Sequence, residues 1–165
     1  MERFDRFGAR GRRAAHTLAA TGIDLSASWA RAANRLLETR RLAKEDADRL
    51  RFYEAFARCI ANTDRHHHNV VLFPELSGTG GKTTVEPTRY QLAPAFDQLP
   101  MFYAPTSDGQ LPPRTFESPT PTADTWDVWD DAKRLAVTFW RRASGHDRVS
   151  EAMRTTAAQN AIALR

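Results

Sequence analysis

One long amphipathic segment constrains the fold of this chain more than any other feature. Residues 44–61 carry apolar side chains at helical spacing, which form a broad stripe along one side of a helix. The stripe consists of Ala47, Leu50, Tyr53, Phe56, Ala57 and Ile60. A helix of this kind must bury its stripe, so we expect it to be the central helix of the core. A polar loop that begins at Asn62 follows this helix directly.

Apolar periodicity predicts four further helices. They cover residues 10–21, 26–41, 125–143 and 150–164. We expect Asp24 or Ser26 to cap the second of them, and Ser150 or Asp147 to cap the last. On the helix over 125–143, one face is expected to carry Trp126, Trp129, Ala132, Ala136, Phe139 and Trp140.

A small β-hairpin is predicted after the central helix. Residues 70–73 form a short apolar run, Gly78–Gly81 is a turn, and 89–92 is the returning strand. Residues 104–125 hold five of the nine prolines and show no periodicity, so an irregular loop is expected there. The predicted fold class is therefore mainly α, a helical bundle with a small β-hairpin.

Length and composition indicate one globular domain. A chain of 165 residues with 41% hydrophobic residues can bury a core, and no apolar run approaches the roughly 20 residues of a membrane span. Cys59 is the one cysteine, so no internal disulfide can form, and we expect a buried thiol in a cytoplasmic protein. The net charge of +4 comes from clustered arginines, but neither a DNA-binding helix pattern nor aromatic–basic alternation accompanies them. A solvated arginine-rich surface is favoured over direct nucleic-acid binding, and a basic cleft would also suit a nucleotide or an acidic peptide.

Three polar residues form a set that phosphoryl transfer requires. Asp64 and Asn69 lie in one loop, and Asp97 follows the predicted hairpin. In phosphoryl transfer an Asp orients the attacking hydroxyl, while an Asn and a second Asp hold magnesium on the nucleotide phosphates. Asp64 is the candidate catalytic residue, with Asn69 and Asp97 as metal and nucleotide ligands, and we expect all three to converge on one cleft at the C-terminal end of the central helix. Taken singly, each also fits a plain structural role, as a helix-end turn, a turn before a strand, or a loop cap.

Two neighbouring patterns are weaker. The consecutive histidines His66, His67 and His68 suggest zinc, but adjacent side chains point apart, so no zinc is expected and the last two are placed at the surface. Gly80 to Thr83 resembles the end of a P-loop, but the full pattern needs a glycine where Leu76 stands.

Three motifs in order resemble those of the HipA family, the serine/threonine kinase toxins of bacterial toxin–antitoxin modules. The family's Asn-Thr-Asp-x-His-x-x-Asn loop is matched by Asn62, Thr63, Asp64, His66 and Asn69. Its Leu-x-Pro-x-(Tyr/Phe)-Asp segment is matched by Leu92, Pro94, Phe96 and Asp97. Its hinge motif is matched by Glu2, Arg3, Phe4, Asp5 and Arg6. The resemblance implies that His66 braces the catalytic loop, that Glu2 and Phe4 contact adenine, and that the cofactors are ATP and Mg²⁺.

The resemblance also implies a domain organisation. The chain, 1–165, resembles the C-terminal lobe of a protein-kinase-like fold whose metal-binding Asp is carried by the hairpin. Its parts would be a hinge remnant 1–8, a catalytic core 44–102, a Pro-rich loop 104–125 and C-terminal helices 126–164. The family's glycine-rich loop and phosphate-binding lysine precede the hinge motif, so we expect these 165 residues alone to transfer phosphate weakly or not at all.

The expected function is phosphorylation of a protein hydroxyl, with a translation component such as an aminoacyl-tRNA synthetase as the substrate that the resemblance suggests. A HipB-like antitoxin or a separate N-terminal lobe is the expected partner. The alternative is a non-catalytic binding module or a truncated remnant that docks such a partner.

Overall fold

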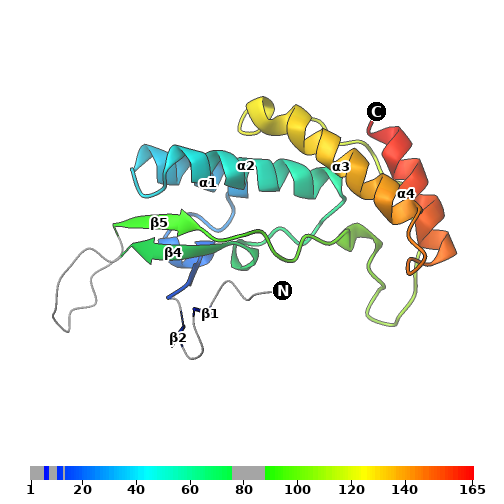
Figure 1. Ribbon diagram of the computed structural model, residues 1–165, viewed down its shortest axis with the longest axis horizontal. Helices are drawn as coiled ribbons and strands as arrows, with labels where there is room; N and C mark the ends of the chain where they lie inside the picture. The colour runs from blue at the N-terminus through cyan, green and yellow to red at the C-terminus, as the bar shows by residue number, and fades with distance from the viewer. Residues whose placement is uncertain (1–5, 8–10, 13, 76–87) are drawn as a thin grey trace. The chain divides into compact units, whose positions relative to one another are not determined.

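The structure, a computed structural model, describes residues 6–7, 11–12, 14–75 and 88–165 (Figure 1). As predicted, it is mainly helical with a small antiparallel sheet. The helices are α1 (Trp29–Glu38), α2 (Lys44–Cys59), α3 (Trp129–Ser144) and α4 (Glu151–Ala163). The described residues divide into two compact units, Met1–Arg51 with His66–Asp97 and Phe52–Arg65 with Gln98–Arg165. No helix in the described parts is both long and apolar enough to cross a membrane.

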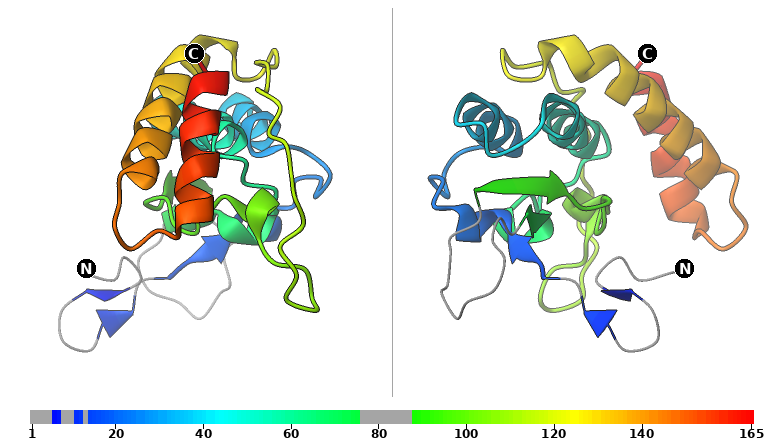
Figure 2. Two further views of the ribbon diagram at one scale, coloured as in Figure 1. Left: turned by 90° about the vertical axis from the view of Figure 1, so that its right-hand side faces the viewer. Right: turned by 60° about the vertical axis from the view of Figure 1, so that its left-hand side comes forward.

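The first unit contains a three-stranded antiparallel sheet in the order β3 (His16–Thr17), β4 (Val71–Glu75), β5 (Arg89–Leu92). Leu72 of β4 pairs with both His16 and Leu92. Helix α1 and the beginning of α2 lie over one face of this sheet (Figures 1 and 2). The buried side chains of this unit include Leu18, Trp29, Ala33, Leu36, Leu42, Ala47, Leu50, Leu72, Tyr90 and Leu92. A separate pair, β1 (Arg6–Phe7) and β2 (Gly11–Arg12), is antiparallel.

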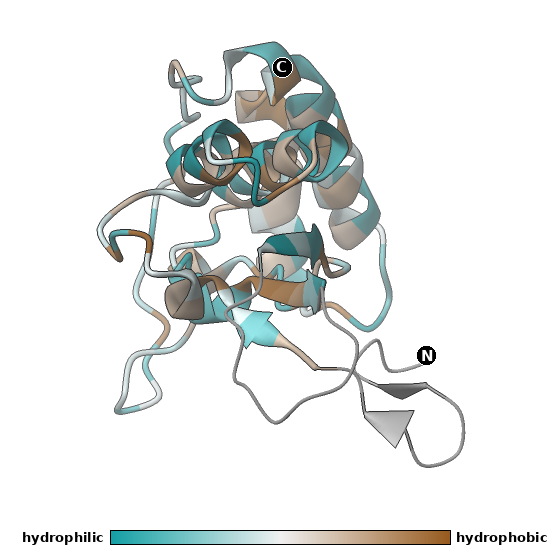
Figure 3. Ribbon diagram, turned by 90° about the vertical axis from the view of Figure 1, so that its left-hand side faces the viewer, coloured by the Kyte–Doolittle hydropathy of each residue, from teal (hydrophilic) through white to brown (hydrophobic). Residues whose placement is uncertain are grey.

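The second unit is built on the end of α2 and the antiparallel pair α3 and α4, which lie side by side (Figure 2). Trp140 is fully buried, and its indole N–H donates to the Cys59 carbonyl at 3.1 Å. The Tyr103 hydroxyl exchanges hydrogen bonds with the Asn160 amide at about 3 Å. In Figure 3, brown and teal segments alternate along the helices, the colouring expected when one side of a helix is buried.

Residues 104–125 contain neither a regular helix nor a strand, which confirms the predicted loop. Two short 3₁₀ turns flank it, η3 (Met101–Tyr103) and η4 (Trp126–Val128). Ser150 caps α4 as expected, because its Oγ accepts from the Met153 N–H at 3.4 Å.

The predicted helix over 10–21 is wrong. Residues His16–Thr17 form β3 and Leu18–Thr21 form the 3₁₀ turn η1, which ends at Gly22 with φ 75°. The extended conformation is stabilised from outside the segment, because β3 pairs with β4 and the Leu18 N–H donates to the Val70 carbonyl at 2.9 Å. A local apolar pattern carries no information about such a partner.

Two finer expectations are also corrected. Helix α1 is capped by Ser28, whose Oγ accepts from the Arg31 N–H at 3.2 Å, and not by Asp24 or Ser26. Asp24 instead accepts from the Ser26 N–H at 2.9 Å in a local turn.

Trp126 does not share the buried face of α3, since it is 74% exposed, whereas Trp129, Ala132, Ala136 and Trp140 are buried. It lies in the 3₁₀ turn η4, whose tighter winding shifts it out of phase with the following α-helix.

Candidate functional site

The loop that carries the candidate residues starts from a tightly closed helix end. After α2, Ala61 adopts a left-handed conformation with φ 58°. The Asn62 N–H donates to the Ala57 carbonyl at 2.8 Å, and the Ala61 N–H donates to the Arg58 carbonyl at 3.1 Å. This pair of bonds is a Schellman motif, which normally has glycine at the left-handed position. The chain therefore leaves α2 in one defined direction.

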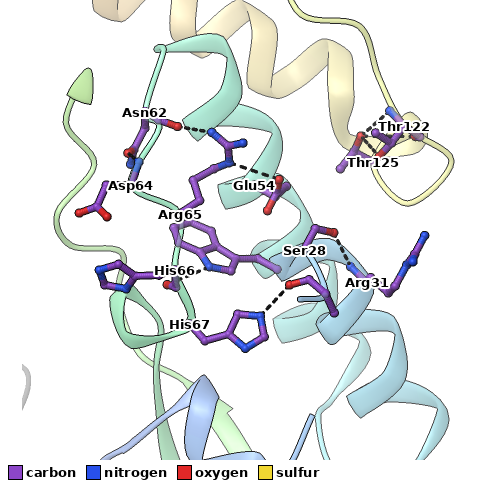
Figure 4. A network of polar contacts seen from close by, with 12 residues as sticks. Ser28, Arg31, Glu54, Asn62, Asp64, Arg65, His66, His67, Thr122 and Thr125 are labelled. Atoms are coloured by element: carbon purple, nitrogen blue, oxygen red, sulfur yellow. Dashed lines mark hydrogen bonds and ion pairs between the residues drawn. The ribbon is translucent and has the colours of Figure 1, made fainter. Parts of the chain in front are cut away.

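Asn62 then holds the backbone at Asp64. Its side chain is fully buried, and its Oδ1 accepts from the Asp64 N–H at 2.9 Å (Figure 4). Arg65 links the same turn to α2. Its side chain donates a hydrogen bond to the Asn62 carbonyl, and its Nε lies 3.4 Å from the carboxylate of the buried Glu54. The turn around Asp64 is thus tied to the body of α2, and Asp64 as a residue is half-buried.

The histidine segment is held by the N-terminal end of α1. The Trp29 indole N–H donates to the His66 carbonyl at 3.2 Å. His67 Nε2 lies 2.7 Å from the Ala27 carbonyl, which can only accept, so this ring carries a proton on Nε2 (Figure 4). Its Nδ1 is buried without a hydrogen-bond partner.

The expected surface position of His67 is therefore wrong, since the residue is 4% exposed and braces the loop. His66 and His68 are exposed, with ring centroids 5.8 Å apart. Sequence spacing gave no signal for choosing among the three, because the choice depends on which ring meets the carbonyl at Ala27.

Asn69 and Asp97 lie at the same end of the β4–β5 pair. Asn69 lies two positions before β4 and Asp97 five positions after β5, and in an antiparallel pair the start of one strand lies beside the end of the other. The segment before Asp97 is anchored twice, because the Leu92 N–H donates to Asp46 Oδ2 and the Ala93 N–H donates to the Val71 carbonyl, both at 2.9 Å.

Asp97 itself is exposed and has a left-handed backbone, with φ 52°. A non-glycine residue there costs free energy, which the surrounding structure must offset. Residues held in this way often occupy functional sites, and Asp tolerates the conformation better than most residues.

The side chains of Asn69 and Asp97 suit a magnesium ion. An amide oxygen and a carboxylate are hard donors, and magnesium usually takes one or two protein oxygens and completes its shell with phosphate and water. Among the described residues, no three His, Cys, Asp or Glu side chains form a metal-binding group. An ion held by Asn69 and Asp97 would take its remaining ligands from phosphate or water. That Asp64 joins these two residues at one cleft stays a prediction.

A cavity of about 440 Å³ adjoins the first half of the loop. Its lining includes Asn62, Thr63 and Arg65 from the loop and the aromatic rings of Phe102 and Phe116. The Pro-rich segment also lines it, through Thr115, Glu117 and Pro119. The cavity is large enough for several side chains of a bound peptide.

Cys59, at the end of α2, is unsuited to nucleophilic chemistry. Burial raises the pKa of its thiol to about 12, so the thiolate is scarcely populated near neutral pH. The prediction of a buried thiol is confirmed.

Several expectations fall on residues outside the described parts of the chain. These are the adenine contacts Glu2 and Phe4, the hairpin turn Gly78–Gly81 and the P-loop-like Lys82. Conversely, no sequence signal marks the bracing groups Trp29, Glu54 and Arg65, because these residue types at these spacings form no motif.

Comparison with known proteins identifies a relative of this chain. No protein-family model matches the chain. The chain is 34% identical over 156 residues to Toxin YjjJ of Escherichia coli (strain K12), an alignment that covers 93% of this chain and 33% of that protein. The chain thus spans about a third of the length of the relative it matches.

Proposed function

We propose that this chain supplies the catalytic loop and the magnesium-binding residues of a HipA-like serine/threonine kinase with a toxin-like role. The observation that carries the proposal is the placement of Asn69 and Asp97 at one end of the β4–β5 pair. The toxin-like role is supported by the similarity to a protein named as a toxin.

In the proposed reaction, Asp64 accepts a hydrogen bond from the acceptor hydroxyl and orients the hydroxyl oxygen toward the γ-phosphorus of ATP. The new O–P bond forms as the bond between the γ-phosphorus and ADP breaks; ADP leaves, and the hydroxyl proton passes by way of Asp64 to solvent. The Asn62 cap fixes the backbone from which this carboxylate extends. Phosphoryl transfer depends largely on positioning and charge stabilisation, so a rigid loop is a suitable base for such a residue.

Asn69 and Asp97 would hold a magnesium ion, and that ion would supply charge neutralisation at the nucleotide phosphates. The cavity next to Asn62 would receive the acceptor segment. Phe102 and Phe116 would contact its apolar side chains, and the lining residues Arg58 and Arg65 would face its acidic ones. A protein hydroxyl, with a translation component as its source, is the substrate class the resemblance suggests, and a HipB-like antitoxin or a separate N-terminal lobe remains the proposed partner.

The direct test is binding of ATP with magnesium to the 165-residue chain, measured by calorimetry. Asp97→Asn and Asn69→Ala are expected to weaken binding at least tenfold, because each removes or weakens a metal ligand. Asp64→Ala is expected to bind normally, since this residue serves the acceptor and not the metal. Asp108→Asn, in the exposed Pro-rich segment, is the matched control and is expected to change nothing.

A second measurement separates binding from chemistry. With an N-terminal lobe supplied in trans, transfer of labelled phosphate from ATP to protein is expected to appear and to be lost in Asp64→Ala, even though ATP binding persists. ATP binding that is equally strong in wild type and Asp97→Asn would refute the proposal and favour the non-catalytic binding module.

A further inference from the structure

A cavity of about 490 Å³ lies in the first unit, between the turn before α1 and the solvent-facing side of that helix. Three arginines line it, Arg31, Arg35 and Arg41. Arg31 and Arg35 are four residues apart on α1, so they project from the same side of the helix. The lining contains one carboxylate, Asp24, so the cavity is net positive.

Arg41 is held rigidly at the edge of this cavity. Its guanidinium donates to the Thr21 carbonyl at 2.9 Å and to the Tyr90 hydroxyl at 3.2 Å, and it stacks 5.3 Å from the centre of the Tyr90 ring. A fixed guanidinium loses little conformational entropy when a ligand arrives. The Arg35 side chain can turn toward a ligand in the cavity, because its contact with Glu38 is an exposed ion pair of little net strength.

The one carboxylate does not cancel this charge. Asp24 accepts from the Ser26 N–H at 2.9 Å, and this backbone hydrogen bond lowers the pKa of Asp24 below its usual value. Asp24 therefore stays ionised and offsets one of the three guanidinium charges, which leaves the lining net positive. The N-terminus of α1 adds partial positive charge beside the turn, and the first turn of that helix contains no acidic residue to offset it.

We propose that this cavity binds a phosphate monoester, carried either by a phosphorylated side chain or by a nucleotide. Guanidinium groups bind phosphate oxygens in a bidentate manner, and a helix N-terminus adds to the attraction. A volume of about 490 Å³ holds more than a bare ion, which points to a phosphate with an organic group attached. This site is separate from Asn69 and Asp97 and does not rest on the proposed kinase activity.

The site has a physical connection to the histidine segment. Ala27 lines the cavity, and its carbonyl accepts from His67 Nε2 at 2.7 Å. The adjoining Trp29 donates to the His66 carbonyl. A ligand that tightens the turn before α1 is therefore expected to shift the NMR signals of the His67 ring, which gives a readout of occupancy independent of affinity.

The test is titration of the chain with phosphoserine, AMP and inorganic phosphate at constant ionic strength, with serine and adenosine as uncharged counterparts. Saturable binding of the phosphate compounds and not of the counterparts is expected. Tighter binding of phosphoserine than of AMP would identify a phosphorylated side chain as the carrier of the phosphate. Tighter binding of AMP than of phosphoserine would identify a nucleotide. Binding of serine or adenosine as strong as that of the phosphorylated forms would overturn the proposal.

A pair of double variants separates a site from general charge. Arg31→Gln with Arg35→Gln is expected to weaken phosphate binding at least tenfold, about 1.4 kcal/mol. Arg141→Gln with Arg142→Gln removes the same charge from exposed positions in the last turn of α3, and is expected to leave binding within twofold. Equal weakening by the two double variants would show non-specific attraction and refute the site. Asp97→Asn is expected to leave phosphoserine binding unchanged, which distinguishes this site from the proposed magnesium site.

Discussion

Replacing Asn62 by alanine should loosen the loop that carries Asp64. The Asn62 side chain is fully buried, and its Oδ1 accepts the Asp64 N–H at 2.9 Å. Alanine removes this acceptor and leaves space where the amide was. Loss of one partner from a buried hydrogen bond costs about 1–3 kcal/mol, and the vacated volume adds to it. We expect the free energy of unfolding to fall by about 2–3 kcal/mol.

Urea denaturation measures this loss. With a slope of about 2 kcal/mol per molar, the midpoint should fall by about 1 M or slightly more. Thr63→Ala is the matched control, because its side chain is exposed beside Asn62, and it should change stability by less than about 0.5 kcal/mol.

Amide hydrogen exchange tests the local cause. The Asp64 amide should exchange faster in Asn62→Ala by more than the global loss of stability explains, because its acceptor is gone. If Asn62→Ala is no less stable than Thr63→Ala, or if exchange at Asp64 is unchanged, then Asn62 does not hold this loop in the way we describe.

Three further predictions concern the same framework. Asp46→Ala should cost about 2 kcal/mol in urea denaturation, because the Leu92 N–H loses its acceptor. Glu38→Ala removes only the exposed ion pair with Arg35 and should cost less than about 1 kcal/mol; equal losses would contradict this. Arg40 is exposed and has a left-handed backbone, with φ 58°, just after the end of α1. Arg40→Gly should therefore stabilise the fold by about 1 kcal/mol and raise the thermal midpoint, whereas Arg40→Ala should not. Stabilisation by both variants would exclude backbone strain as the cause. Burial raises the pKa of Cys59 from 9.0 to about 12, so the stabilisation from its neutral thiol is complete below pH 9 and lost as the pH rises from 9 to about 12. Denaturation at several pH values should show the stability difference between wild type and Cys59→Ala shrinking over that range, and a constant difference would disprove it.

The main elements of the fold were predictable because their causes are local. The apolar stripe of 44–61 predicts α2, and the short apolar runs predict β4 and β5, because periodic burial depends only on spacing along the chain. The Pro-rich loop was predictable for a similar reason, since proline prevents regular hydrogen bonding within its own segment. The candidate residues Asp64, Asn69 and Asp97 likewise came from order and spacing alone.

Contacts between distant segments decided the rest. His16 is extended because β4 provides a partner 56 positions further along the chain, and His67 is the buried member of its triplet because its ring meets the Ala27 carbonyl. The arginines of the second cavity surround one space only because α1 packs against the turn before it and Arg41 is fastened to Tyr90. A sequence determines where a chain can bury apolar surface, since that follows from local periodicity. Which hydrogen-bonding groups meet across the fold depends on packing in three dimensions, and so only the tertiary structure decided it.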